Sequence, residues 1–198
     1  KMKIGAIDFQ QEINLLKSIR NQFSSKDIEL RVDANGAFHP TNALEKLKIL
    51  SDLDLHSIEQ PIKQGQIDAM ATLCKKTPLP IALDEELIGV FSVTKKHELL
   101  QTIIPQYIIL KPSLVGGFSG SDEWINLAEK QNIGWWITSA LESNVGLNAI
   151  AQYTYTKQSI MPQGLGTGSL FTNNFECPMQ VNNGQLQYNN LKNWKFNL

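Results

Sequence analysis

The sequence predicts a closed barrel of parallel β-strands in which a helix follows each strand. Short apolar runs alternate along the chain with segments of helical periodicity, a pattern typical of βαβ units. The polar residues that end these runs recur every 25 to 30 positions, at Lys3, Asp33, Glu59, Asp84 and Lys111. One strand, one helix and two loops need about 30 residues. An open doubly wound sheet would bind a ligand at one switch point, whereas here every successive strand offers a polar residue, which favours a barrel.

The helices are expected where apolar residues recur at helical spacing behind a cap or a proline. Asp8 should cap the first helix, whose apolar stripe begins at Ile13, and Pro40 should open the second. Pro78 and Pro80 should end the third, because proline cannot continue a helix. The expected helices are 8–23, 40–50, 68–75, 93–100, 121–131 and 142–155.

Seven strands are expected between these helices. Their ends lie near Lys3, Asp33, Glu59, Asp84, Lys111, Ser139 and Gly164. Because a closed barrel of this kind has eight strands, we expect a first strand to precede Lys1. Residues 1–170 should form the barrel domain, and 171–198 a tail with a hairpin at 179–188 that turns at Asn183-Gly184.

The composition is that of an ordinary water-soluble domain. The chain has 198 residues, 42% of them hydrophobic, and a formal net charge of −1. With no basic run, nucleic acid is an improbable partner, and with no apolar stretch of about 18 residues, a membrane span is equally improbable. No secretory signal opens the chain, so we expect a cytoplasmic protein that acts on a small molecule. Cys74 and Cys177 lack the spacing of a zinc site and are expected to be core or surface thiols.

Three acidic residues end successive strands, and the carboxyl ends of parallel strands share one crevice. Asp33, Glu59 and Asp84 should therefore converge and offer hard oxygen ligands, the set that Mg²⁺, or Mn²⁺ in its place, prefers. The absence of His and Cys among them argues against zinc or copper. The alternative is three unrelated loop acids that cap helices or pair with basic residues. Glu85 and Glu86 adjoin Asp84, but Asp84 lies nearest the apolar run and is preferred.

Two lysines open the chain beside these acids. Lys1 and Lys3 are two residues apart on a strand, so their side chains should leave the same face about 6.5–7 Å apart. A second ammonium and a metal ion nearby should lower a lysine pKa towards that of a usable general base. A single lysine at a strand end is usually a solvated surface residue, but the acids favour the catalytic interpretation. Lys111 should face Lys3 across a bound substrate.

Further candidates for substrate binding are Asn35, Ser139 and the glycine-rich turn at 164–168. Backbone N–H groups around Gly164 and Gly166 could hold a substrate carboxylate, although a purely structural role is as plausible. The glycine spacing is not a dinucleotide fingerprint. No nucleophile elbow surrounds any serine, so Ser-His-Asp chemistry is improbable.

Several short motifs occur in a characteristic order. They are Lys-x-Lys at 1–3, Asp-Ala-Asn at 33–35, Ile-Glu-Gln-Pro at 58–61, Leu-Asp-Glu at 83–85, Leu-Lys-Pro at 110–112 and Ser-Ala-Leu-Glu-Ser-Asn-Val-Gly at 139–146. In this order they resemble the enolase superfamily, muconate-lactonizing subgroup, and within it most closely the o-succinylbenzoate synthases. The resemblance covers essentially the whole chain and is specific in combination.

The resemblance implies a role for each of these residues. Asp33, Glu59 and Asp84 would bind Mg²⁺. Lys3 would abstract the proton α to a carboxylate, and Lys111 would lie on the opposite face of the enediolate. The implied reaction is the dehydration of 2-succinyl-6-hydroxy-2,4-cyclohexadiene-1-carboxylate to o-succinylbenzoate in menaquinone synthesis. A preceding α+β capping domain would supply the first strand, and the tail after residue 171 would pack against it.

Other functions remain open. N-succinylamino acid racemases and dipeptide epimerases of the same subgroup also use two opposed lysines. Similar dipeptide epimerases carry Asp-x-Asp at the eighth strand, where this chain reads Gly-Leu-Gly-Thr-Gly at 164–168, which disfavours the epimerase. A non-catalytic barrel fragment is a third possibility, although intact Lys3 and Lys111 argue against a loss of activity.

Overall fold

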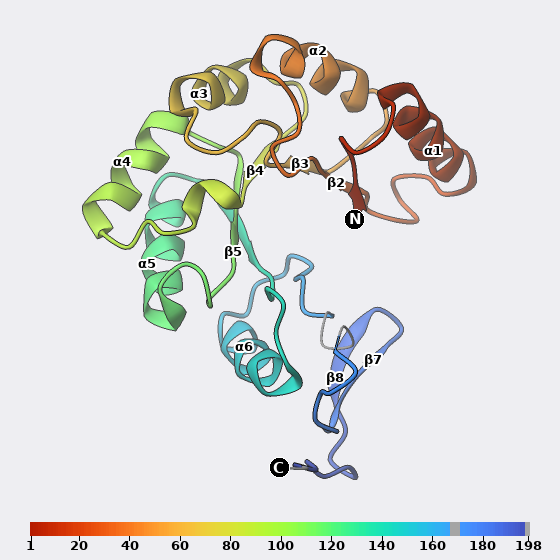
Figure 1. Cartoon of the computed structure of the whole chain (residues 1–198), viewed down its shortest axis with the longest axis vertical. Helices are drawn as coiled ribbons and strands as arrows, with labels where there is room; N and C mark the ends of the chain where they lie inside the picture. The colour runs from red at the N-terminus through yellow and green to blue at the C-terminus, as the bar shows by residue number, and fades with distance from the viewer. Residues whose placement is uncertain (167–170, 197–198) are drawn as a thin grey trace. The chain divides into compact units, whose positions relative to one another are not determined.

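The computed structural model of the chain describes residues 1–166 and 171–196 (Figure 1). The chain forms two compact units. The first contains Lys1–Ile109 and Trp124–Trp135, and the second contains Leu110–Glu123 and Trp136–Leu198.

The predicted parallel sheet is confirmed. Its strands are β1 (Met2–Lys3), β2 (Arg31–Asp33), β3 (Ser57–Glu59), β4 (Ile81–Leu83), β5 (Tyr107–Leu110) and β6 (Gly134–Ile137), ordered as in the chain. The pairs from β1 to β5 are parallel. The seventh expected strand is wrong in extent: among the described residues, it is reduced to one parallel bridge between Thr138 and Gly164.

The helices lie close to their predicted positions. They are α1 (Phe9–Gln22), α2 (Pro40–Ser51), α3 (Ile67–Lys76), α4 (Val93–Ile103), α5 (Gly117–Lys130) and α6 (Asn144–Thr156), with a short 3₁₀ helix, η1 (Glu85–Leu87). Asp8 caps α1 as predicted, since its carboxylate accepts from the backbone N–H groups of Gln10 and Gln11. Helix α5 begins earlier than expected. Its first turn contains two glycines, which are poor helix formers and hid the start.

The core of the first unit lies between strands and helices. Figure 1 shows α1 to α4 on one side of the strands of this unit, and α3 packs on both α2 and α4. Val32, Ile58 and Ile81 on the strands and Leu16 and Leu47 on the helices are fully buried. Strand residues buried in this way are typical of a parallel sheet that helices cover.

Cys74 and Cys177 are both free, as predicted. Cys74 is buried, and burial together with the charge of Glu86 raises its pKa to about 12. Its thiol therefore behaves as a core side chain. Within the described ranges, none of the helices has the length and apolar character needed to cross a membrane.

In the second unit, the predicted hairpin is confirmed as β7 (Met179–Asn182) and β8 (Gln185–Tyr188), an antiparallel pair. Asn183 and Gly184 both have positive φ, as a tight two-residue turn requires. Asn144, at the start of α6, donates from its side chain to the carbonyl of Phe175, which ties the tail to this helix. The division into domains at residue 170 stays a prediction.

Arg20, near the end of α1, binds the loop between α1 and β2 and the loop between α2 and β3. Both loops precede a strand, whereas the acids lie where the strands end. Its guanidinium donates to the carbonyls of Leu53 at 2.9 Å, Asp54 at 2.8 Å and Ile28 at 3.0 Å. These carbonyls follow helices α2 and α1, and otherwise depend on water. A planar guanidinium reaches them together because its donors form a rigid fork.

Replacing Arg20 should therefore weaken the first unit. We expect Arg20→Met to lower the free energy of unfolding by about 2 kcal/mol, because hydrogen bonds to a charged group are lost while the apolar stem is kept. Urea denaturation measures the change. Lys17→Met, at an exposed position of the same helix, is the matched control and should change stability by less than about 0.5 kcal/mol. Equal effects of the two substitutions would contradict this role of Arg20.

Candidate active site

The register of the sheet aligns the predicted site residues on four neighbouring strands, β1 to β4. Lys3 pairs with Asp33, and Asp33 pairs with Glu59. Glu59 pairs in turn with Ala82, two residues before Asp84. Side chains two apart on a strand share one face, so this register directs all three acids and Lys3 to the same edge and face of the sheet. The predicted convergence of the acids therefore follows from the strand pairing.

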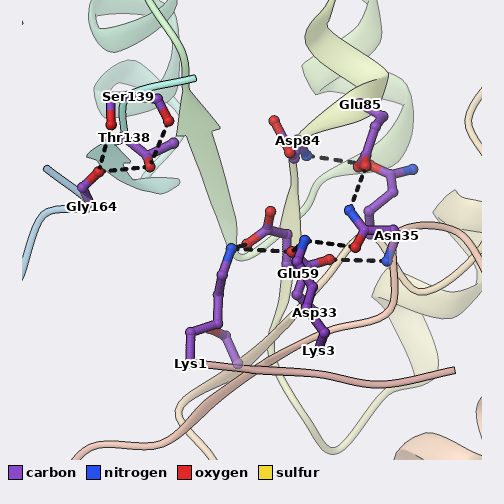
Figure 2. A network of polar contacts seen from close by, with 12 residues as sticks. Lys1, Lys3, Asp33, Asn35, Glu59, Asp84, Glu85, Thr138, Ser139 and Gly164 are labelled. Carbon is purple, nitrogen blue, oxygen red and sulfur yellow. Dashed lines mark hydrogen bonds and ion pairs between the residues drawn. The ribbon is translucent and has the colours of Figure 1, made fainter. Parts of the chain in front are cut away.

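The two lysines meet the first two acids directly (Figure 2). Lys1 Nζ lies 3.1 Å from Asp33 Oδ2 and 2.7 Å from Glu59 Oε2. Lys3 Nζ lies 2.5 Å from the same Asp33 oxygen and 2.6 Å from Asn35 Oδ1. The expectation that both lysines emerge on one face is thus confirmed.

The acids are deeply buried, although the lysines are not. The exposed fraction is 0% for Asp33, 4% for Glu59 and 1% for Asp84. Burial raises the pKa of Glu59 to about 8; the charges of Asp33 and Asp84 also raise it, and Lys1 opposes them. At Asp33 burial acts in the same direction, but the hydrogen bond from Lys3 and the charge of Lys1 outweigh it and lower the pKa. The cluster thus concentrates negative charge where water cannot screen it.

The expected lowering of a lysine pKa is wrong for Lys1 in this arrangement. Burial lowers the pKa of Lys1, but the adjacent carboxylates of Glu59 and Asp33 outweigh burial and raise it. The sequence argument considered the second ammonium and a metal ion. It did not anticipate that Lys1 lies between two carboxylates, each of which stabilises its charged form.

The remaining candidates belong to the second unit. Lys111 directly follows β5, and its predicted position opposite Lys3 stays a prediction. Ser139 donates from its backbone N–H to the carbonyl of Gly164 at 3.1 Å, and Thr138 Oγ1 donates to the same carbonyl at 2.9 Å (Figure 2). A side chain at position 164 would collide with Thr138, so close packing already explains this glycine. Substrate binding by Ser139, Gly164 and Gly166 stays a prediction, and Gly168 of the same turn lies outside the described residues.

Comparison with known proteins identifies the family. Residues 1–191 match the family described as "Enolase C-terminal domain-like". The chain belongs to the enolase superfamily. It falls in the muconate-lactonizing subgroup, which confirms both the resemblance and the predicted barrel class.

Among the curated members of this superfamily, the chain is 59% identical over 186 residues to the o-succinylbenzoate synthase of Desulfotalea psychrophila (strain LSv54), a match that covers 94% of this chain and 50% of that protein. It is 28% identical over 162 residues to the L-Ala-D/L-Glu epimerase of Bacillus subtilis, covering 81% and 43%. The chain thus spans about half the length of the curated relatives that it matches.

Solved structures of the enolase superfamily agree with this assignment. The crystal structure of MenC from Desulfotalea psychrophila LSv54 superposes with a TM-score of 0.89 at 57% identity, covering 93% of this chain and 51% of that one. The muconate lactonizing enzyme from Pseudomonas putida superposes with a TM-score of 0.83 at 26% identity, covering 93% and 51%.

Members of the enolase superfamily typically use a divalent metal. The described residues contain no group of three or more His, Cys, Asp or Glu side chains spaced to hold a metal ion. Lys1 lies instead between Asp33 and Glu59. The donor chemistry nevertheless fits a hard divalent cation, because the three buried side chains that end neighbouring strands are all carboxylates. Their assignment as Mg²⁺ or Mn²⁺ ligands stays a prediction.

Asn35, predicted to bind substrate, is bound on both sides of its amide. Its Oδ1 accepts from Lys3, and its Nδ2 donates to Glu85 Oε1 at 2.8 Å (Figure 2). Sequence reasoning treated Glu85 only as a neighbour of Asp84 and missed this contact. The other carboxylate oxygen of Glu85, Oε2, is buried and accepts no hydrogen bond within the described part of the chain. The amide of Asn35 therefore helps to orient Lys3.

Glu12 of α1 is a second residue that sequence reasoning missed. Its Oε1 accepts from the backbone N–H groups of Gly5 at 2.6 Å and Ala6 at 3.2 Å, in the loop that follows Lys3. Gly5 has φ +89°, and a Cβ there would lie 2.5 Å from the Cβ of Ala37. The sequence feature that could have revealed this role is the position of Glu12, an acid beside Ile13 in the apolar stripe of the helix. Glu12 therefore fixes the loop behind the two lysines.

The raised pKa of Glu59 predicts a pH dependence of stability in metal-free buffer. Between its ordinary value of 4.5 and about 8, Glu59 binds a proton more tightly in the folded than in the unfolded chain, so the free energy of unfolding should fall as pH rises through this range. Glu59→Gln removes the titration. Between pH 5 and pH 8, we expect the free energy of unfolding of Glu59→Gln to fall by about 1 to 2 kcal/mol less than that of the unsubstituted chain.

Urea titrations at several pH values in the presence of a chelator measure this effect. Glu45→Gln, at an exposed position of α2, is the matched control and should keep the decline of the unsubstituted chain. The same decline in Glu59→Gln would show that another group is responsible.

Proposed function

We propose that this chain carries the catalytic barrel of a metal-dependent lyase that dehydrates 2-succinyl-6-hydroxy-2,4-cyclohexadiene-1-carboxylate to o-succinylbenzoate. The site that supports this proposal is the pair of lysines directed onto buried carboxylates, with Lys3 Nζ 2.5 Å from Asp33. A divalent cation held by these acids would neutralise their charge and leave Lys3 as an amine that can take a proton from a carbon acid. The 59% identity to an o-succinylbenzoate synthase favours the dehydration over the other reactions of the subgroup.

In the proposed reaction, Lys3 takes the proton from the carbon α to the substrate carboxylate. The electron pair left on that carbon spreads into the carboxylate, which becomes a dianionic enediolate. The pair then expels the hydroxyl from the neighbouring carbon, and the hydroxyl leaves as water with the proton that Lys3 had taken, which returns Lys3 to its starting form. Lys1 and Lys111 are the ammonium groups available to stabilise the developing negative charge.

Asp33, Glu59 and Asp84 are the residues that would hold the divalent cation. When bound, Mg²⁺ or Mn²⁺ supplies a Lewis acid that neutralises charge on the substrate carboxylate. Asn35 orients the Lys3 ammonium through the hydrogen bond from Nζ to its Oδ1. The small carboxylate substrate, the metal and a cytoplasmic location are all parts of this proposal.

A second candidate is the racemisation of N-succinyl amino acids. It begins with the same proton abstraction and ends with return of a proton to the opposite face by the second lysine. The chain is 34% identical over 135 residues to the N-succinylamino acid racemase of Thermus thermophilus, covering 68% of this chain and 35% of that protein. Dipeptide epimerisation is disfavoured, because residues 164–168 offer no carboxylate for a substrate ammonium.

Turnover assays distinguish these candidates. We would assay the chain by itself and joined to the N-terminal half of the Desulfotalea psychrophila relative, with the cyclohexadiene carboxylate and with N-succinyl amino acids. We expect the joined protein to form o-succinylbenzoate, to lose activity with a chelator, and to recover it with Mg²⁺ or Mn²⁺. Racemisation alone would support the second candidate. A folded, metal-binding protein with neither activity would support the non-catalytic fragment.

The two lysines should dominate the chemical step. We expect Lys3→Ala and Lys111→Ala each to lower kcat by about 10³-fold or more while KM changes little, because their main interactions are with the transition state. Steady-state kinetics measure both constants. Lys63→Ala, at an exposed position of the loop after β3, is the matched control and should keep full activity. An active Lys3→Ala variant would assign the base to another residue.

A further inference from the structure

Gln60 is a fully buried polar residue for which the proposed reaction has no direct use. It directly follows Glu59, and its exposed fraction is 0%. Its backbone has φ +38°, a left-handed conformation that is uncommon for a residue other than glycine. Such a conformation is unfavourable for a residue with a side chain and persists only where surrounding contacts enforce it. Those contacts therefore indicate what Gln60 does.

Every hydrogen-bonding group of Gln60 is satisfied by a named partner. Its side-chain Oε1 accepts from the backbone N–H groups of Asp84 at 3.2 Å and Glu86 at 3.4 Å. Its Nε2 donates to the carbonyl of Ile62 and to Glu86 Oε2, both at 3.1 Å. Its backbone N–H donates to the carbonyl of Ala82 at 2.9 Å, and its carbonyl accepts from the N–H of Gly36 at 2.7 Å.

These partners lie on the segments that carry the three candidate metal ligands. Glu59 is the preceding residue, and Asp84 is bound through its own backbone N–H. Gly36 belongs to the turn that follows Asp33, and its N–H is bound by the Gln60 carbonyl. One side chain and its backbone thus connect the ends of β2, β3 and β4. The distances among the three carboxylates depend on how these ends are held.

The chemistry of the contacts requires an amide at position 60. The oxygen faces two N–H donors, whereas the nitrogen faces a carbonyl and a carboxylate, so only one orientation of the amide satisfies all four. A glutamate would lose both donors and would place a second negative charge beside Glu86. A methionine has similar length and would lose all four side-chain hydrogen bonds.

We propose that Gln60 is a positioning residue that sets the spacing of Asp33, Glu59 and Asp84 for a divalent cation. It does not itself contact the cation or the substrate. The proposal rests on the proposed function in so far as those acids bind a metal. Residues that orient the ligands of a metal site commonly contribute 10–100-fold to metal affinity.

The test is the affinity of the full chain for Mn²⁺ by itself, measured from the electron paramagnetic resonance of the free ion and by titration calorimetry. We expect Gln60→Met to raise the Kd for Mn²⁺ by about 10–100-fold. Gln66→Met is the matched control, because Gln66 lies in the same connection and donates only to the carbonyl of Lys63 among the contacts recorded for its side chain in the described residues. Its Kd should stay within twofold of the unsubstituted chain.

A second pair of variants keeps the test decisive if Gln60→Met does not fold. Gln60→Glu should weaken Mn²⁺ binding to a similar extent. The exchange Gln60→Glu with Glu86→Gln restores a donor and an acceptor between positions 60 and 86, although it does not restore the donor to the Ile62 carbonyl, and should recover about tenfold of the lost affinity. A residue that mattered only for folding would change the Tm without changing the Kd of the folded fraction.

The outcomes separate this inference from the proposed function. Folded Gln60→Met or Gln60→Glu with a Kd within twofold of the unsubstituted chain would overturn the positioning role, while the metal site and the lyase would stand. An unsubstituted chain that binds no Mn²⁺ would overturn the metal site, and with it the role of Gln60. If Asp84→Asn and Glu59→Gln each leave the Kd for Mn²⁺ unchanged, the cation binds elsewhere. That result would also overturn the inference.

Discussion

The first unit depends on one constraint, namely that negative charge buried at the ends of neighbouring parallel strands must be balanced. Asp33, Glu59 and Asp84 are almost inaccessible to water. Burying a carboxylate without a partner costs more free energy than most single contacts supply, so the strands can end in acids only if cations approach them. Lys1 and Lys3 provide that charge, each within hydrogen-bonding distance of Asp33. The same buried carboxylates are the kind of ligand that a hard divalent cation prefers.

Buried side chains hold the loops that follow the strand ends by hydrogen bonds to backbone N–H groups. Glu12 binds the N–H groups of the loop after β1, and Gln60 binds the N–H of Asp84 after β4. Glu86 Oε1 accepts from the N–H of Gly65, which holds the loop after β3. Each of these buried side chains has at least one oxygen that accepts from a backbone N–H group, which would otherwise be buried without a partner. Their satisfaction and the geometry of the acids are therefore parts of the same arrangement.

The chain is similar to enzymes whose names describe different reactions. The same half of the fold matches an o-succinylbenzoate synthase at 59% identity and a muconate lactonizing enzyme at 26% identity. In the proposed reaction, the base and the buried acids serve the removal of the proton α to a carboxylate. The later fate of the enediolate depends on groups that contact the rest of the substrate, and a fold by itself does not specify them.

The sequence by itself determined the alternation of strands and helices, the cap at Asp8, the helix start at Pro40, the hairpin turn at Asn183-Gly184 and the order of the acids and lysines. These features depend on local periodicity and on residue types that favour one backbone conformation, so a single chain displays them. The tertiary structure decided which atoms meet. Lys1 reaches Glu59 across 58 positions of the chain, and this contact raises the Lys1 pKa that the sequence had suggested would fall. The hydrogen bonds of Glu12 and Gln60 to loop N–H groups likewise required the structure, as did the reduction of the seventh strand, within residues 1–166 and 171–196, to one bridge at Gly164. No local pattern encodes them, because each depends on the distance and orientation of residues brought together only by strand pairing and loop packing.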